Sequence, residues 1–119
     1  MFNLKRIIIL VVLLTVTMGL FAASKTKDNN DMVISPNPMK DYTEIICSFD
    51  NLAYASLVIT DLKGVVLKTI FTGQLEKGKH AFTWDGTDYR NIRLQEGAYV
   101  VELSYGTRFT SLKKFVILK

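Results

Sequence analysis

The chain has 119 residues, of which 49% are hydrophobic and 22% charged, and its formal net charge is +4. This length suits one domain and is too short for two. The small positive charge does not favour nucleic acid as a partner, and the single cysteine, Cys47, excludes an internal disulfide. The single histidine, His80, is not enough for a metal site and has no partners for a catalytic triad. The composition therefore favours a domain held by packing, with no cofactor and no small-molecule substrate.

Residues 1–24 have the three parts of a secretory leader. Lys5 and Arg6 form a basic head, residues 7–23 are uncharged, and the small residues Ala22 and Ser24 suit cleavage after position 24. An uncleaved anchor is the alternative, because the uncharged run is just long enough to span a bilayer. We expect an exported protein, with the membrane involved only through this leader during export.

Residues 25–31 are polar and offer no apolar side chain to bury, so we expect a flexible lead-in. The rest of the chain alternates between apolar and polar residues in short runs, with turn residues about every ten positions. This rhythm is typical of a β-sandwich. No stretch keeps the 3.6-residue spacing of apolar residues that a helix would require over three turns. The sequence predicts a seven-stranded antiparallel immunoglobulin-like β-sandwich over residues 32–119. Its strands are expected at 32–34, 43–49, 53–60, 65–71, around His80, Phe82 and Trp84, from Gly97 onward, and at 109–118.

The expected connections follow from turn residues. Residues 61–64 form a tight hairpin with Gly64 at positive φ, and residues 72–78 form a longer connection with a glycine at each side. All glycines are expected at turns. Pro36, Asn37 and Pro38 mark a corner at a sheet edge, because proline cannot donate to a ladder. Cys47 shares a face with apolar neighbours and is expected in the core.

The motif Trp84-Asp85-Gly86-Thr87-Asp88 admits two interpretations. A calcium loop or an acid pair would use the two carboxylates, but calcium loops place oxygen ligands at alternating positions and usually add a bidentate glutamate, which is missing after Asp88. We favour a structural role, in which Trp84 fills the core, Asp85 caps the turn and Gly86 takes positive φ. Gly97 and Tyr99 are expected to open a strand and to join the core.

Five segments of the chain also carry a family resemblance. They are Ile34-Ser-Pro-Asn-Pro-Met, Leu57-Val-Ile-Thr-Asp-Leu-Lys-Gly, the stretch from Gly78 to Asp88, Gly97-Ala-Tyr-Val-Val-Glu-Leu and a closing strand with two adjacent lysines. In order and spacing they resemble the C-terminal sorting domains (type A) of type IX secretion cargo. They are equally similar to the immunoglobulin-like domain of flagellar hook-capping proteins. Ser35 and Thr60 depart from that pattern, where an aromatic residue and a tyrosine are common.

The resemblance implies a non-catalytic domain that secretion machinery recognises for outer-membrane translocation or surface attachment. It also implies a Gram-negative cell, in which the protein passes through the periplasm to the cell surface or medium. It implies that Lys113, Lys114 and Lys119, near Arg108, form the recognised end, although lysines on an edge strand also prevent unwanted strand pairing. Three alternatives stay open: a standalone adhesion or interaction module, a structural piece of an envelope assembly, and a remnant of a longer cargo. The expected leader disfavours the hook-capping role, because caps leave through the flagellar channel.

Overall fold

The computed structural model describes residues 29–108 and 110–119. The expected leader and most of the lead-in lie outside the described residues. Within the described ranges every regular element is a strand, and no helix there is long and apolar enough to cross a membrane. The strands are β1 (Asp31–Ser35), β2 (Thr43–Phe49), β3 (Ala53–Thr60), β4 (Val66–Leu75), β5 (Gly78–Trp84), β6 (Gly97–Tyr105) and β7 (Thr110–Leu118).

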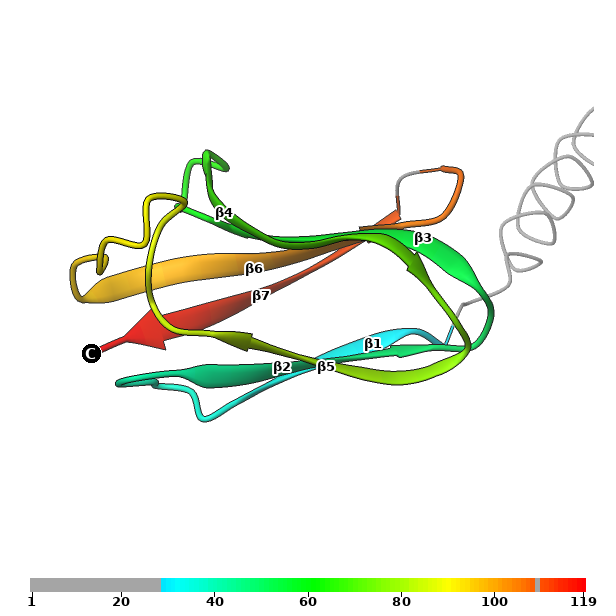
Figure 1. Ribbon diagram of the computed structural model, residues 1–119, viewed down its shortest axis with the longest axis horizontal. Coiled ribbons are helices and arrows are strands. Elements are labelled where there is room, and N and C mark those ends of the chain that lie inside the picture. Colours follow the sequence, from blue (N-terminus) through cyan, green and yellow to red (C-terminus); the bar gives the residue numbers. More distant parts are fainter. Residues whose placement is uncertain (1–28, 109) are drawn as a thin grey trace, which may run out of the picture.

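The strands form two layers that face each other (Figure 1). One sheet has the order β1-β2-β5 and the other has the order β4-β3-β6-β7, and all strand pairs within the sheets are antiparallel. The sandwich predicted from the alternating pattern is therefore confirmed, together with its seven strands and the absence of helices from the described residues.

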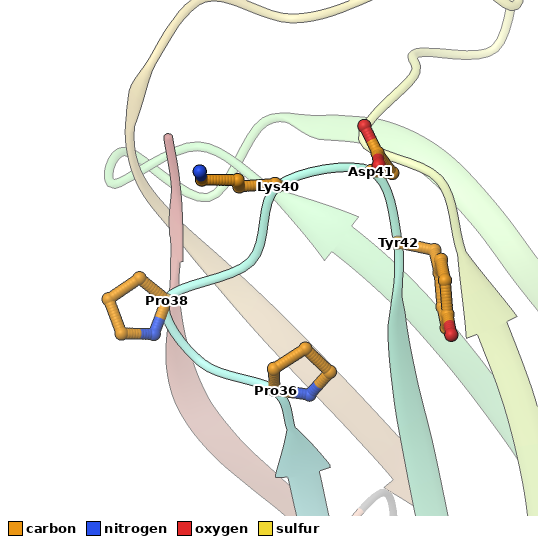
Figure 2. Close-up of a pocket in the computed structure, with 5 residues that line it drawn as sticks. All are labelled: Pro36, Pro38, Lys40, Asp41 and Tyr42. Carbon is orange, nitrogen blue, oxygen red and sulfur yellow. The ribbon is translucent and has the colours of Figure 1, made fainter.

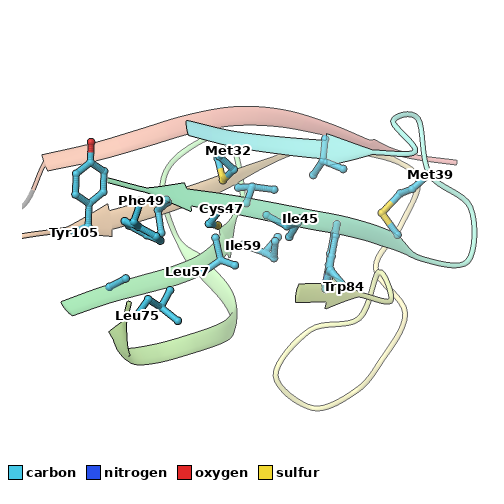
Figure 3. Close-up of a cluster of buried hydrophobic side chains, with 14 of the residues drawn as sticks. Met32, Met39, Ile45, Cys47, Phe49, Leu57, Ile59, Leu75, Trp84 and Tyr105 are labelled. Carbon is cyan, nitrogen blue, oxygen red and sulfur yellow. The ribbon is translucent and has the colours of Figure 1, made fainter. Parts of the chain in front are cut away.

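The core lies between the sheets and is built from every second residue of the central strands (Figure 3). Because side chains alternate across a strand, Ile45 and Cys47 of β2 face Leu57 and Ile59 of β3, and all four are almost fully buried. A fully buried aliphatic side chain contributes about 1.5–3 kcal/mol to folding, so burial between the two sheets stabilises the domain. Burial also raises the pKa of the Cys47 thiol to about 11, which keeps it protonated at neutral pH.

One predicted connection is wrong. Residues 72–78 were expected to form a loop, but β4 continues through Gly73 to Leu75, and only Glu76 and Lys77 link it to β5. Gly73 pairs with Ala55 inside the sheet, so the glycines do not all fall at turns. The strand continues because Leu75 buries its side chain at the edge of the core, and this apolar contact outweighs the turn preference of a single glycine.

The connections fall into two groups at opposite ends of the sandwich (Figure 1). We call one the loop-rich end, which carries residues 36–42, 61–65 and 85–96, and the other the turn end, which carries residues 50–52, 76–77 and 106–108. The described chain begins at the turn end. There Asn30 Oδ1 accepts a hydrogen bond from the Asp50 N–H over 3.0 Å, so the polar residues just before β1 contact the first turn.

Candidate recognition surface

The 85–96 loop is pinned to the core at both of its ends. Trp84 is almost fully buried, and its Nε1–H donates to the Thr87 carbonyl over 2.9 Å. The Tyr99 hydroxyl donates to the Gln95 carbonyl over 2.6 Å, and the rings of Trp84 and Tyr99 meet edge to face at 6.1 Å. An aromatic ring with a polar end suits this position, because the ring packs in the core while its donor satisfies a loop carbonyl. Gly97 opens β6 directly after the loop.

Gly86 leaves room for an arginine that ties two loops together. The Arg93 guanidinium donates to the carbonyl of Asp85 over 2.7 Å and to the carbonyls of Lys40 and Asp41 in the neighbouring 36–42 loop. A Cβ at position 86 would lie 2.6 Å from Arg93 Nη1, and the residue has φ of +79°. Glycine is therefore required here both for its backbone conformation and for the close passage of the guanidinium.

The two carboxylates of the motif accept hydrogen bonds from the loop itself. Asp85 Oδ1 accepts from the N–H and hydroxyl of Thr87, which lowers the pKa of Asp85 below its usual value, with help from the charge of Lys68. Asp88 Oδ1 accepts from the backbone N–H of Arg90 and of Ile92. Desolvation alone would raise the pKa of Asp88. The two N–H donors and the nearby cations lower this pKa by more than desolvation raises it, so the net shift is downward. The structural interpretation of the motif predicted the turn cap at Asp85, but it assigned no such role to Asp88.

The Pro36–Met39 segment contacts the edge of β7 through the Asn37 side chain and one isolated parallel bridge. Asn37 Nδ2 donates to the Phe115 carbonyl over 2.9 Å, and Asn37 Oδ1 accepts from the Ile117 N–H over 2.8 Å. Met39 then bridges to Leu118, donating its N–H to the Ile117 carbonyl. Both prolines follow cis peptide bonds and provide no N–H, so the asparagine amide supplies the pairing that proline cannot. The sequence indicated the corner at Pro36 and Pro38 but not this contact.

The lysines predicted to be recognised do not form one cluster. Lys113 pairs with Glu102 on the neighbouring strand at 3.5 Å, whereas Lys114 projects from the other side of β7 and pairs with Asp31 of β1 at 3.6 Å. Lys119 lies at the loop-rich end. Arg108 lies in the turn before β7, at the opposite end. An inward-facing charge such as that of Lys114 protects an edge strand from pairing with other sheets.

Three hollows on the described surface are open to solvent. One of about 370 Å³ is lined by Pro36, Pro38, Lys40, Asp41 and Tyr42, and Figure 2 shows the last three side chains pointing in different directions. Two smaller hollows, of about 200 and 120 Å³, lie over β6, β7 and the 61–64 hairpin. His80 lies on β5, away from these hollows, with its Nε2 2.7 Å from the Glu76 carbonyl. Among the described residues, no group of three or more His, Cys, Asp or Glu side chains could hold a metal ion.

Comparison with known sequences finds similarity to flagellar proteins. The family model described as "FlgD Ig-like domain" matches residues 49–108. The basal-body rod modification protein FlgD of Escherichia coli (strain K12) is 43% identical over 54 residues, and its counterpart in Salmonella typhimurium is 35% identical over 54 residues. Each match covers 45% of this chain and 23% of the relative, so the chain corresponds to less than a quarter of the relatives' length.

Comparison with solved structures shows the same fold in longer chains. Dimeric latent PorU from Porphyromonas gingivalis gives a TM-score of 0.62 at 15% identity, covering 80% of this chain and 10% of PorU. PorZ, an essential bacterial surface component of the type-IX secretion system of the same organism, gives 0.52 at 20% identity, covering 74% of this chain and 11% of PorZ. FlgD from P. aeruginosa gives 0.52 at 18% identity, covering 77% of this chain and 78% of that one.

Proposed function

The chain belongs to the FlgD Ig-like domain family, and from that membership we propose that it is a non-catalytic, exported module of the bacterial cell envelope that works through contacts with other proteins. Its finer role in this proposal is that of a type IX sorting domain, recognised by secretion machinery for translocation or surface attachment. The observation that supports the finer role is a similarity of fold. About four fifths of the chain matches part of PorU, and about three quarters matches part of PorZ. PorZ itself is described as a surface component of that secretion system.

The geometry of the described surface supports a binding role over a catalytic one. Catalysis requires a nucleophile or acid–base pair within hydrogen-bond reach of one reacting position. The one cysteine is buried in the core, and Asp85 and Asp88 are occupied by the donors of their own turns. The polar groups of this sandwich thus hold loops in place, which suits a module that presents a surface.

In this proposal residues 1–24 are a cleaved leader, residues 25–31 are the lead-in, and residues 32–119 are the recognised domain. The last residue of the lead-in, Asp31, already pairs with Ser48 as the first residue of β1. The recognised surface includes Lys113 and Lys114 on β7 and Lys119 just after it. A partner with a carboxylate-lined surface fits these lysines, because the intramolecular pairs of the first two are exposed and therefore weak. The three lysines need not touch one another if the partner follows the strand along its length.

The test replaces the lysines and leaves the chain length unchanged. Removing the last residues would delete buried Leu118 and the hydrogen bond from the Lys119 N–H to Met39, so truncation would unfold the domain as well as remove charge. We expect the K113Q/K114Q/K119Q variant, expressed with its leader in a bacterium that has type IX secretion, to accumulate in the periplasm. Surface delivery is measured by protease accessibility on intact cells, with thermal unfolding as the check on folding.

The matched control is K77Q/K79Q/R90Q, which removes the same charge from exposed positions in the 76–77 turn, on β5 and in the 85–96 loop. It should be delivered like the wild type. Equal surface delivery of both triple variants would contradict the sorting role while leaving the family and the envelope location intact.

A second candidate function is a structural piece of an envelope assembly. The 43% identity to FlgD of Escherichia coli over 54 residues favours it. In that case the chain should co-purify in fixed stoichiometry with an envelope structure, and the lysine variants should leave this association unchanged.

A further inference from the structure

The outer edge of β7 is only partly covered by the rest of the domain. β7 is the last strand of its sheet, and its antiparallel register with β6 is unbroken along the whole strand. In such a ladder a residue turns both its N–H and its carbonyl to the same side, and the side alternates along the strand. The Ile117 N–H and carbonyl both bond to the 36–39 segment, so the odd-numbered residues of β7 are those that face away from β6.

This alternation leaves a row of free backbone groups in the first half of β7. Ser111 and Lys113 turn their N–H and carbonyl groups outward, and Phe115 turns its N–H the same way. Within the described ranges no residue bonds to these groups. An edge with unpaired donors and acceptors is a template for one more strand. We call residues 111–115 the free edge.

The fold itself uses the neighbouring part of this edge to hold an extended segment. The 36–39 segment passes beside the end of β7 and bonds to three successive outward-facing positions, 115, 117 and 119 (Figure 2). Its backbone bridge, between Met39 and Leu118, is parallel. An added strand would continue the same row from position 115 toward the turn end.

The charged side chains of the free edge favour an acidic partner. Lys113 and Lys114 are consecutive, so they project from opposite faces of β7. Their ion pairs with Glu102 and Asp31 are exposed and therefore weak, so each ammonium group is able to meet a carboxylate on an added strand. A second copy of β7 would bring its own lysines to the same edge, and this repulsion disfavours self-association.

An apolar position lies next to the two lysines. Phe115 exposes 65% of its surface, lies on the same face as Lys113, and has Val100 of β6 as its cross-strand neighbour. A hollow of about 120 Å³ is lined by these three residues and Lys114. An aliphatic side chain opposite Phe115 would cover part of the ring, and cross-strand pairs of an aromatic with a β-branched residue are favourable.

We infer that the free edge of β7 binds an extended segment of another protein by β-strand addition, and that this segment carries two consecutive acidic residues beside an aliphatic one. In strand addition the backbone hydrogen bonds provide affinity and the side chains select the partner. The inference rests on the proposed function in that a partner recognises β7. It adds the mode of binding and the chemistry of that partner.

A synthetic peptide tests the chemistry of the partner. The probe is Thr-Thr-Val-Glu-Glu-Val-Thr-Thr with both ends blocked, which matches the free edge in either strand direction. We expect it to bind the exported protein with a Kd on the order of 100 μM in an NMR titration, because only a short stretch pairs. The peptide with two lysines in place of the glutamates should bind at least about 10-fold more weakly. Equal binding of the two peptides would overturn the inference.

Hydrogen exchange at single residues tests the mode of binding. In the free protein the amides of Ser111 and Lys113 should exchange fast, whereas those of Leu112 and Lys114, which face β6, should be protected. At about 1 mM acidic peptide, roughly ten times the expected Kd, exchange at Ser111 and Lys113 should slow by about 10-fold, because roughly one molecule in eleven is then unbound. A peptide held by charge alone would leave these two amides unprotected and would overturn strand addition. Protection of both before any peptide is added would overturn it as well.

Three variants locate the contact. K113Q/K114Q should bind the acidic peptide at least about 3-fold more weakly. The matched control K77Q/K79Q, which removes the same charge from the 76–77 turn and from the edge strand β5, should bind like the wild type. Asp31→Asn frees Lys114 from its ion pair and should tighten binding about 2-fold, a gain that unfolding cannot produce. Equal weakening by the two double variants, or no tightening in Asp31→Asn, would contradict a contact at the free edge.

The peptide measurements and the delivery measurement fail separately. Loss of surface delivery in K113Q/K114Q/K119Q, together with no peptide binding to the wild type, would keep the sorting role and overturn strand addition. Peptide binding with the expected exchange pattern, together with unchanged delivery of that variant, would keep strand addition and contradict the sorting role.

Discussion

The two ends of the sandwich are ordered by different means. At the turn end each contact involves a short turn: the Gly106 N–H donates to the Tyr54 carbonyl, and the Asn30 side chain accepts from the Asp50 N–H. At the loop-rich end side chains cross between loops, as Arg93 does. Short turns are largely set by the strands that they join, whereas a twelve-residue loop must offset about 1–2 kcal/mol of backbone entropy per ordered residue. Side-chain bonding is therefore concentrated where the loops are long.

The largest expected effect comes from removing the side chain that supports the long loop. Trp84→Ala should destabilise the domain by about 3–5 kcal/mol, because it opens a cavity in the core and leaves the Thr87 carbonyl without its indole donor. Tyr54→Ala at the turn end, where the ring is 61% exposed, should change stability by no more than about 0.5 kcal/mol. Urea unfolding followed by circular dichroism measures both. Similar losses in the two variants would contradict the contrast between the ends.

Two glycines with the same backbone conformation allow a closer comparison. Gly86 and Gly106 both have φ of +79°, but a Cβ at Gly86 would meet Arg93 at 2.6 Å, whereas a Cβ at Gly106 would meet nothing within 4 Å. Left-handed backbone costs an alanine about 1–2 kcal/mol, so Gly106→Ala should lose about that much. Gly86→Ala should lose about 1 kcal/mol more, because the guanidinium must move away from the loop carbonyls. Urea unfolding of the two variants gives the difference directly, and equal losses would show that Arg93 moves freely.

The sequence allowed the strands to be predicted because alternation is a local signal. Ile45, Cys47 and Phe49 follow one another at every second position, and this spacing is enough to place them on one buried face. The same local reasoning failed at Gly73, where the preference of one residue was weighed without knowing that Leu75 would find the core. Turn residues indicate where a chain is able to turn, and packing decides whether it does.

The contacts of the loop-rich end were predictable only in part, because several of them join residues that are far apart in the sequence. The short-range roles of Asp85 and Gly86 depend on residues within a few positions, so the motif indicated them. Lys68 and Thr87 are 19 positions apart, and Asn37 and Ile117 are 80 apart. No spacing in a single sequence connects such pairs, because the contact exists only after the strands between them have paired. The exposed apolar residues of the 85–96 loop could be read from the sequence, but the hydrogen bond from Tyr89 to Leu67 of β4 could not.

A smaller effect is expected at the other long-range contact of the loop-rich end. Asn37→Ala removes two hydrogen bonds to β7 and should cost about 1–2 kcal/mol. Asn30→Ala at the turn end removes one bond from a part-buried site and should cost about 0.5–1 kcal/mol. Hydrogen exchange should also show faster exchange of the Ile117 N–H in the first variant only. Unchanged exchange at Ile117 would mean that the Asn37 side chain does not hold the end of β7.

The smallest expected effect is that of acid, which should destabilise the loop-rich end before the turn end. The pKa of Asp88 is lower in the folded protein than its ordinary value of 3.8, so its ionised form is favoured by folding. The stability that it contributes is present above the pKa of the unfolded chain and is lost as pH falls through the lower folded value. Between pH 5 and pH 2.5, the urea midpoint should therefore fall less in Asp88→Asn than in the wild type. The same carboxylate accepts from the N–H groups of Arg90 and Ile92. As the pH falls, these two amides should therefore lose protection from hydrogen exchange before the amides of Asp50 and Gly106 do. If the two ends opened together as the pH fell, the carboxylate would not be what orders the long loop.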